Sequence, residues 1–529
     1  MSERKSGEDI TRAASVVGIG TLFSRILGLF RDVLITSLFP AGTSLDAFVV
    51  AFRIPNLLRR LFGEGALNAA FIPVFSEYLT TKSRREAFDL ARIVMTALVL
   101  ILAVISAIGM VFAPQFLKIQ VPGWSDGQEM DKMALTANLL RLMFPYVILI
   151  CLTALSAAML NTLKHFASGA FYPVLLNVSI IGSALILGGQ FDEPVMALAV
   201  GVLIGGVLQL LLQLPPLIKR RFYYRPMLQP RHPGLRRIVL LMLPSMIAFG
   251  VVEINAYVDM LLASFLAPGS NSYLFFANRL VQLPLALFGI AVATPILPKL
   301  SKLAAKGETA DFRATFGLGM RLIVFFTLPS SAGLILLRRP IVNLLYERGA
   351  FTRESTDAVA FALLFYAVGV FAFAAVKIAA TAFYARKDTK TPVIVAAVAL
   401  LSNVVLNIIL MQFLAHGGLA LASSISSFIN LVLLLLYAAK KRIVTLDREE
   451  TTPILKSVAA AVVMTLTCWA LLHLVGYDYG ASLGFRILQL SGIVVGSIAV
   501  FIFVSKLIRC EELGLFISSF TRRRGGRRG

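Results

Sequence analysis

Long apolar stretches, interrupted by short clusters of charged residues, glycine and proline, run through almost the whole chain. A helix that crosses the hydrocarbon core of a bilayer needs about 20 mainly apolar residues. The pattern therefore predicts an all-α polytopic membrane protein with about fourteen transmembrane helices. The predicted spans are 13–39, 45–79, 86–113, 134–162, 168–188, 194–218, 236–266, 271–299, 312–337, 355–385, 391–413, 418–439, 453–475 and 483–508.

The composition agrees with this pattern. Of the 529 residues 58% are hydrophobic and 15% are charged, whereas a soluble domain has roughly 25% charged residues. A disordered chain, a soluble enzyme and a small secreted domain held by disulfides are excluded, and the three cysteines show no metal or disulfide spacing. Because the N-terminus is polar and no small-residue cleavage site follows, we expect no removable signal peptide.

The formal net charge of +22 reflects topology. Between the predicted spans, 34 lysines and arginines fall on one side of the membrane and 7 on the other. Since basic loops stay in the cytoplasm, both termini are predicted to be cytoplasmic, and no nucleic-acid partner is expected. We predict that the tail at 511–529 is a basic cytoplasmic segment close to anionic lipid head groups.

The two halves of the chain resemble each other at an offset of about 226 residues. DVLITSLFPAG (32–42) aligns with DMLLASFLAPG (259–269), and AFIPVFSEY (70–78) aligns with PILPKLSKL (295–303). Six helices per copy is an even number, so the repeats are parallel, as in several transporter folds. The predicted domains are an N-terminal lobe (1–222), a C-terminal lobe (223–442), two extra helices (443–510) and the tail (511–529).

Charged residues inside the predicted spans are candidates for function, because each costs ~2.5–3.5 kcal/mol at the bilayer centre. Arg53 has a basic counterpart, Arg279, in the second repeat, while most other charges of the first repeat align with apolar residues. Pairing inside the bundle remains open for Arg60 with Glu64 and for Arg25 with Asp32, and Arg141 and Arg321 lie near span ends. The charged residues within spans are Arg25, Arg31, Asp32, Asp46, Arg53, Arg59, Arg60, Glu64, Arg141, Glu253, Asp259, Arg279, Arg321 and Lys377.

This distribution favours an anion held between the lobes, since guanidinium groups match phosphate geometry. Helix breakers accumulate in the same region, within PNLLRRLFGEGALNAAFIP (55–73). Irregular backbone at membrane depth is tolerated where it lines a cavity or is buried in protein. A broken helix at a substrate site and a kinked packing helix are both compatible with this pattern.

A second, weaker constellation consists of side-chain oxygens. Asn403 and Asn407 are one turn apart, and Asp259 and Ser423 lie in other predicted spans. Oxygen ligands of this kind suit Na⁺, although asparagines in spanning helices also serve as hydrogen bonds between helices.

Motifs of soluble catalysis are absent from the sequence. There is no G-x-x-x-x-G-K-[ST] loop, no H-E-x-x-H and no G-x-S-x-G. We therefore expect no enzyme activity and no resident cofactor apart from a coupling Na⁺. Transport would run on a substrate gradient, an ion gradient or the membrane potential.

Four segments carry a resemblance to a known family. FSRILGLFRD (23–32), LDAFVVAFRIPNLLRRLFGEGAL (45–67), NRLVQLP (278–284) and RKDTKTPV (386–393) are similar to the MurJ/MviN family. These proteins are lipid II flippases of the multidrug/oligosaccharidyl-lipid/polysaccharide (MOP) exporter superfamily. The resemblance extends over the whole chain.

The resemblance implies two six-helix lobes arranged as a V around a cationic cavity, with the last two helices lining a groove for the polyprenyl tail. By motif, Arg31, Arg59 and Arg279 would meet the pyrophosphate and head group. Some members bind Na⁺ in the second lobe, at places similar to Asp259, Asn403, Asn407 and Ser423. The remaining family positions tied to function, or flanking them, are Ser24, Arg25, Asp32, Asp46, Arg53, Arg60 and Glu64.

The expected function is transport of the peptidoglycan precursor lipid II from the cytoplasmic to the periplasmic leaflet of a bacterial inner membrane by alternating access. We expect a monomer in contact with membrane lipids, with cell-wall synthesis enzymes as candidate partners. The alternatives are a flippase for another polyprenyl-pyrophosphate glycan, a cation-coupled drug exporter of the same superfamily, and a membrane-embedded glycosyl- or phosphotransferase.

Overall fold

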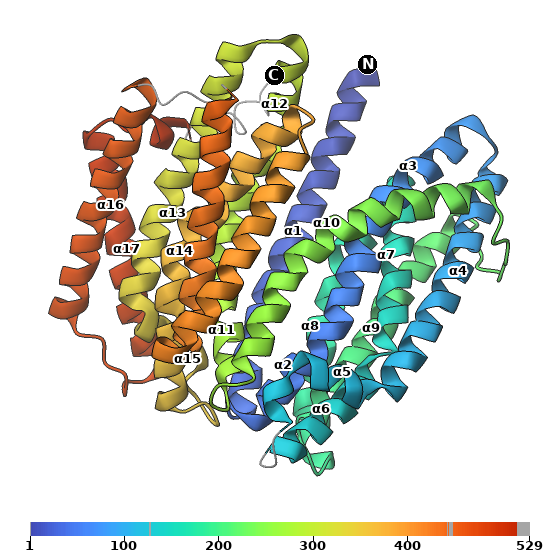
Figure 1. The fold of residues 1–529 in the computed structure, drawn as a ribbon, viewed down its shortest axis with the longest axis horizontal. Helices are drawn as coiled ribbons and strands as arrows, with labels where there is room; N and C mark the ends of the chain where they lie inside the picture. The colour runs from blue at the N-terminus through green and yellow to red at the C-terminus, as the bar shows by residue number, and fades with distance from the viewer. Residues whose placement is uncertain (1, 126–128, 442, 444–447, 516–529) are drawn as a thin grey trace. The chain divides into compact units, whose positions relative to one another are not determined.

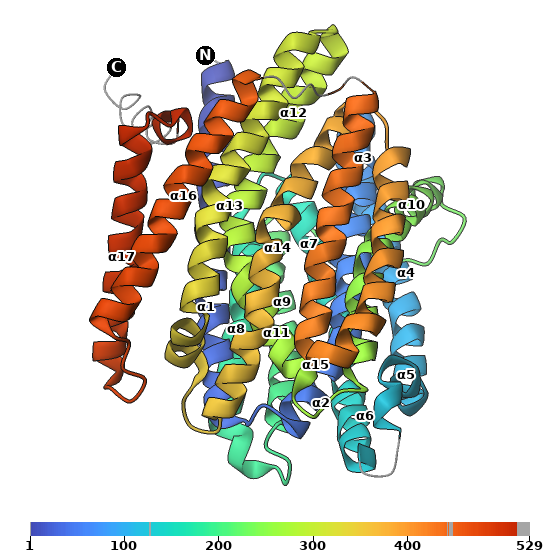
Figure 2. The same cartoon turned by 60° about the vertical axis from the view of Figure 1, so that its left-hand side comes forward.

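The computed structural model describes residues 2–125, 129–441, 443 and 448–515, and within these ranges all regular structure is helical (Figures 1 and 2). The predicted all-α polytopic fold class is confirmed. The chain divides into two compact units. Unit 1 contains Met1–Ser272 and Arg348–Phe351, and unit 2 contains Tyr273–Glu347 and Thr352–Gly529. The division into lobes at residues 222 and 223 stays a prediction.

Unit 1 is a bundle in which two helices, α4 and α10, begin at side-chain caps. Ser83 Oγ accepts a hydrogen bond from the Glu86 amide (3.2 Å), and His232 Nδ1 accepts one from the Gly234 amide (3.2 Å). Such caps satisfy amide groups that have no partner inside the helix. The elements are α1 (Ser2–Leu38), α2 (Thr43–Leu58), η1 (Arg59–Gly65), α3 (Ala66–Thr81), α4 (Arg84–Val111), α5 (Ala113–Gln120), η2 (Pro122–Trp124), α6 (Met130–Met143), α7 (Tyr146–Thr162), α8 (Ala167–Leu187), η4 (Gly188–Gln190), α9 (Met196–Lys219) and α10 (Pro233–Ala263).

Unit 2 is built around α14, whose buried face is rich in alanine. Ala372, Ala374, Ala375, Ala379 and Ala382 are all fully or almost fully buried. Small side chains let helix backbones approach closely, which is how membrane helices gain packing energy without a hydrophobic driving force. The elements are α11 (Ser270–Pro284), η5 (Leu285–Ile290), α12 (Ala291–Lys306), α13 (Thr309–Tyr346), α14 (Arg353–Ala385), α15 (Lys390–Lys440), α16 (Arg448–Val475) and α17 (Leu483–Leu507).

Helix α15 contains two predicted spans that meet at a sharp turn. Ala415 has φ +45° and ψ −129°, outside the helical region. A side chain at Gly418 would collide with the Leu410 carbonyl, so this turn requires glycine there. Asn403 contacts Ser423 (3.5 Å) although 20 residues separate them, whereas a straight helix would place them about 30 Å apart. The segment is therefore a helical hairpin.

Ten helices in the described part of the chain are long and apolar enough to cross a membrane. One of these ten is the α15 hairpin, which contains two of the predicted spans, and Met130–Thr162 joins α6 to α7. The count of fourteen spans stays a prediction.

The last two helices, α16 and α17, are anchored to α13 by polar contacts at two separate places. Figures 1 and 2 show α16 and α17 side by side, and Phe325 of α13 packs against them in an apolar cluster. At one end, Arg321 contacts Glu511 (3.3 Å) and the fully buried Glu512 (3.6 Å). At the other end, the buried Asn343 accepts hydrogen bonds from Tyr477 (3.0 Å) and Arg486 (3.1 Å). These polar anchors make the pair a fixed part of unit 2.

We predict that Arg321→Ala lowers the free energy of unfolding in detergent by about 3–5 kcal/mol, because it leaves the Glu512 carboxylate buried without its cation. Lys306→Ala is the matched control, since it removes the exposed pair with Glu308 and should cost about 0–1 kcal/mol. Equal effects of the two changes on thermal unfolding would contradict this role of Arg321.

The RKDTKTPV segment also has a structural explanation. Asp388 accepts hydrogen bonds from the Thr391 amide (3.1 Å) and hydroxyl (2.7 Å), and it pairs with Lys441 just beyond the end of α15. The hydrogen bond from the Lys441 ammonium lowers the pKa of the Asp388 carboxyl from 3.8 to about 2. The motif thus joins the two ends of the α15 hairpin outside the spans.

A pH dependence follows from that lowered pKa. A carboxyl whose pKa is lower in the folded state stabilises the fold above its unfolded pKa and loses this contribution as the pH falls toward the folded value. We expect Asp388→Asn to be less stable than the parent protein at pH 6. The difference should shrink between pH 4 and pH 2 in detergent thermal melts. A difference independent of pH would count against the ion pair.

Candidate functional site

Arg31 lies on α1 and is held by two polar neighbours. Its Nη2 and Nε donate to Asp32 Oδ1 (2.6 and 3.0 Å), and its Nη1 donates to Asn177 Oδ1 on α8 (3.1 Å). Asn177 in turn donates to the Ser24 carbonyl (3.1 Å). The predicted residues Ser24, Arg31 and Asp32 therefore form one cluster, in which the half-buried Arg31 guanidinium is fixed in orientation.

Asn177 was not among the residues that the sequence singled out. It stands alone as an amide in the apolar run of α8, FYPVLLNVSII. A buried polar residue in a spanning helix usually bonds across to another helix, and here it connects α8 to two points on α1. Its isolation in that run was the available signal.

Arg59 and Arg60 open the π-helical segment η1. Arg59 donates from Nε (3.1 Å) and Nη2 (2.9 Å) to the side-chain oxygen of Asn56, which lies one turn earlier on α2. Arg60 forms an ion pair with the buried Glu253 of α10. The sequence offered Glu64 as the partner of Arg60, but the Glu64 side chain lies outside the described residues. The observed partner comes from a distant helix.

The break predicted within residues 55–73 takes the form of this π-helix. A second π-helical segment, η5, begins at Leu285, which is 226 positions after Arg59, the offset of the sequence repeat. Both repeats therefore widen the helix at the same place, whereas charged residues occupy that place in the first repeat alone. The fold accounts for the π-helix without Arg59, whereas Arg60 has a structural partner in Glu253. π-Bulges are common at functional sites.

Asp46 lies at the centre of a buried polar network in unit 1. Its carboxylate accepts hydrogen bonds from the Gly269 amide (2.7 Å) and from the amide (2.8 Å) and hydroxyl (2.6 Å) of Ser272. The Lys132 ammonium, only 3% exposed, donates to Asp46 (3.2 Å) and lies over the Trp124 ring (3.9 Å). Because both oxygens of Asp46 are used inside unit 1, this side chain anchors the segment between α10 and α11.

The other candidate cations have different surroundings. Arg25 is exposed on α1, and the half-buried Arg53 lies over the ring of Tyr257 on α10 (5.9 Å). Arg279 is half-buried on α11 and belongs to unit 2, whereas the other predicted arginines belong to unit 1. Unit 1 therefore brings Arg31, Arg59 and Arg60 into ordered polar contacts, each with a different partner.

The residues considered for Na⁺ contact one another within the α15 hairpin. Asn407 donates to Asn403 Oδ1 (2.9 Å), and Asn403 donates to Ser423 Oγ (3.5 Å). Asp259 lies half-buried on α10 in unit 1. Among the described residues, no group of three or more histidine, cysteine or acidic side chains could hold a metal ion. The contact between Asn403 and Ser423 joins the two arms of the hairpin, and a role of this cluster in Na⁺ binding stays a prediction.

Comparison with known proteins identifies the chain. The family profile "Lipid II flippase MurJ" matches residues 35–488. The probable lipid II flippase MurJ of Vibrio cholerae is 38% identical over 470 residues, which are 88% of this chain and 90% of that protein. The lipid II flippase MurJ of Burkholderia cenocepacia is 37% identical, over 82% of this chain and 85% of its own length.

Solved structures agree with the sequence comparison. A lipid II flippase MurJ in an inward closed conformation matches with a TM-score of 0.77 and 30% identity, covering 93% of this chain and 98% of that one. An inward-facing multidrug resistance MATE family transporter of the MOP superfamily matches at 0.69 with 13% identity, covering 82% and 98%, which shows the fold alone. The fold is that of a multi-pass transporter, and a MATE family transporter of the MOP superfamily shares it. Within this class, the chain belongs to the lipid II flippase MurJ family.

We predict that Asp46→Ala lowers the free energy of unfolding by about 3–5 kcal/mol, because it removes the buried carboxylate partner of Lys132 and leaves three buried donors without their acceptor. Glu129→Gln is the control. Glu129 is the more exposed partner of Lys132 (3.3 Å), so its loss should cost about 1 kcal/mol or less. Chemical unfolding in detergent measures both, and an Asp46 variant as stable as the control would show that the network is dispensable.

Proposed function

We propose that this protein carries lipid II from the cytoplasmic to the periplasmic leaflet of a bacterial inner membrane, with both termini in the cytoplasm. Family membership over most of the chain supports the substrate. The excess of basic residues on one side of the predicted spans supports the orientation. The head group crosses by alternating access, and the polyprenyl tail stays in lipid beside α16 and α17.

The observation that carries the choice of site is the asymmetry of the two π-helical segments. Both repeats contain the segment, so the bundle does not need charged residues there. Charge placed in a membrane bundle without a structural need marks a substrate path. We assign the pyrophosphate to Arg31 and Arg59, with Arg279 of unit 2 as the third cation.

The local contacts of these arginines suit that role. Arg59 is oriented by the neutral side-chain oxygen of Asn56. The guanidinium of Arg31 is oriented by Asp32 and Asn177 through three of its five N–H groups, and the remaining donors are suited to phosphate oxygens. A transition between states follows when lipid II binds one state more tightly than the other.

Asn403, Asn407 and Ser423 bond to one another in the α15 hairpin, and the proposal assigns no transport step to Na⁺.

The substrate leaves chemically unchanged in this proposal. Mass analysis of lipid II recovered after incubation with the purified protein should therefore give the intact molecule, whereas a transferase would yield a shortened or extended one.

The test is delivery of lipid II to the periplasmic face in cells whose only flippase is this protein. Arg31→Ala, Arg59→Ala and Arg279→Ala should each reduce delivery by about 10- to 100-fold, the equivalent of one charge-assisted hydrogen bond to phosphate. Lys118→Ala, which removes an exposed cation on α5, should leave delivery unchanged. Normal delivery by all three arginine variants would overturn the assignment.

The same preparation tests the alternative substrate. Vesicles that contain the purified protein and either labelled lipid II or another polyprenyl-pyrophosphate glycan report on transfer between leaflets. Selective transfer of lipid II supports the proposal, and selective transfer of the other glycan would replace it.

A further inference from the structure

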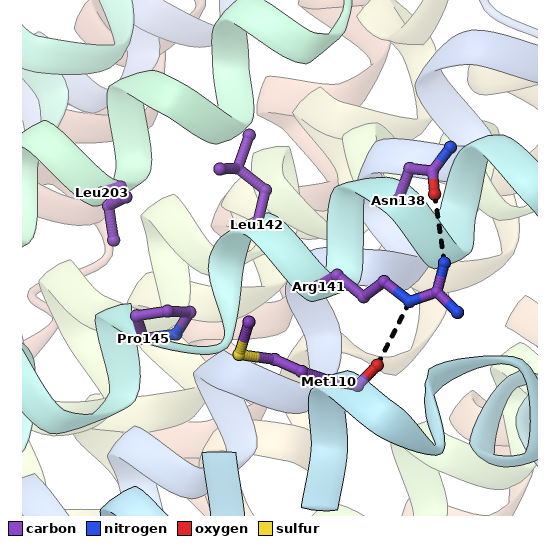
Figure 3. Close-up of a pocket in the computed structure, with 6 residues that line it drawn as sticks. All are labelled: Met110, Asn138, Arg141, Leu142, Pro145 and Leu203. Atoms are coloured by element: carbon purple, nitrogen blue, oxygen red, sulfur yellow. Dashed lines mark hydrogen bonds between the residues drawn. The ribbon is translucent and has the colours of Figure 1, made fainter. Parts of the chain in front are cut away.

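A pocket on the surface of unit 1 contains an arginine that the proposed function does not use. It has a volume of about 320 Å³ and lies where α4, α6 and α9 meet (Figure 3). Four of its lining residues are apolar, and Arg141 and Asn138 supply its polar edge. The pocket is lined by Met110, Asn138, Arg141, Leu142, Pro145 and Leu203.

Arg141 is held in place but keeps donors to spare. Its Nε donates to the Met110 carbonyl (3.1 Å) and its Nη1 to Asn138 Oδ1 (3.3 Å), as Figure 3 shows. These are the acceptors that it contacts among the described residues. Three of its five N–H groups are left for a ligand. The side chain is exposed, so an anion can reach it.

The surroundings of the pocket are those of a surface that faces acyl chains. On α4, Ile101, Val104, Ile108 and Val111 are 46–66% exposed, and on α9 the exposed residues include Val207. Large exposed apolar side chains on successive turns of a spanning helix indicate contact with lipid. A cation at the edge of such a surface is positioned for a lipid head group.

Helix geometry places the pocket at the level of lipid phosphates. Arg141 precedes the exposed Lys164 by 23 residues and Met110 follows Arg92 by 18 residues. These separations correspond to about 34 Å and 27 Å along a helix, close to the ~30 Å thickness of the hydrocarbon core. If Lys164 and Arg92 mark one interface, then Arg141 marks the other, which the distribution of basic residues makes periplasmic.

From these observations we infer that this pocket binds one anionic glycerophospholipid of the periplasmic leaflet. Its phosphodiester contacts the free edge of Arg141, and an acyl chain lies along Leu142, Pro145 and Leu203. The lining residues include one cation and no carboxylate, so the pocket offers no charged partner to an ammonium group. It therefore favours phosphatidylglycerol over phosphatidylethanolamine. This inference does not depend on the transport of lipid II.

The test is native mass spectrometry of the full-length protein, taken from nanodiscs of phosphatidylglycerol and phosphatidylethanolamine into mild detergent. The parent protein should retain one tightly held phosphatidylglycerol. Arg141→Ala should weaken this retention about tenfold or more, since charge-assisted hydrogen bonds are lost. Lys118→Ala is the matched control, because it removes an exposed cation on the neighbouring α5 and leaves the pocket intact.

A second variant tests the apolar part of the pocket without altering its charge. Leu203→Trp fills the groove and should also reduce retention, while equal melting temperatures in lipid-free detergent show that each variant is folded. Glycerophosphoglycerol, which is the head group without acyl chains, should not displace the bound lipid at equal concentration.

Three outcomes would overturn the inference. If the Arg141→Ala variant retains the lipid as well as the parent protein does, the lipid belongs to the nonspecific shell of lipids around the protein. Equal retention of phosphatidylethanolamine would remove the charge selectivity. Displacement by the free head group would indicate a phosphate site on the surface instead of a lipid site.

Discussion

The cost of placing a charge in an apolar medium is the constraint on which the rest of this structure depends. A bare ion in a bundle of spanning helices is expensive, so it must find a partner or remain at an interface. Asp46 with Lys132, Arg60 with Glu253, and Arg321 with Glu512 satisfy this requirement inside their units. In each pair the two side chains come from different elements, so each pair also fixes the packing of those elements.

Comparison of the two repeats shows which features belong to the architecture of the bundle and which are particular to one copy. Both copies contain a π-helical segment at the same offset, which means that the local widening belongs to the architecture. The first copy adds Arg59 and Arg60 to that segment, where the second has Leu285 and Ala286. A duplicated fold thus supplied two equivalent positions, and charge was introduced at one of them. Because of this difference, the π-helical segment of unit 1 carries cations, whereas that of unit 2 is apolar.

Asparagine amides orient the cations of unit 1. Asn177 and Asn56 accept from Arg31 and Arg59, respectively, and neither asparagine carries charge. Asn56 orients Arg59 without adding a counter-charge, whereas Arg31 is oriented both by Asn177 and by the carboxylate of Asp32. Carboxylates also pair with Arg60 and Lys132. The partner that orients a cation therefore often lies on another helix.

The sequence by itself determined the all-helical membrane fold and the family, and it predicted a parallel repeat, because apolar periodicity, repeated motifs and charge counts are local properties of the chain. It also placed a break or kink within residues 55–73 from the prolines and glycines there, and the structure shows a π-helix at Arg59–Gly65. Only the tertiary structure decided that Arg60 pairs with Glu253 and that Asn177 holds Arg31. It likewise showed that residues 390–440 fold back as a hairpin with contact between Asn403 and Ser423. Such partners are up to 193 residues apart, and the packing of whole helices, which no local pattern encodes, brings their side chains within bonding distance.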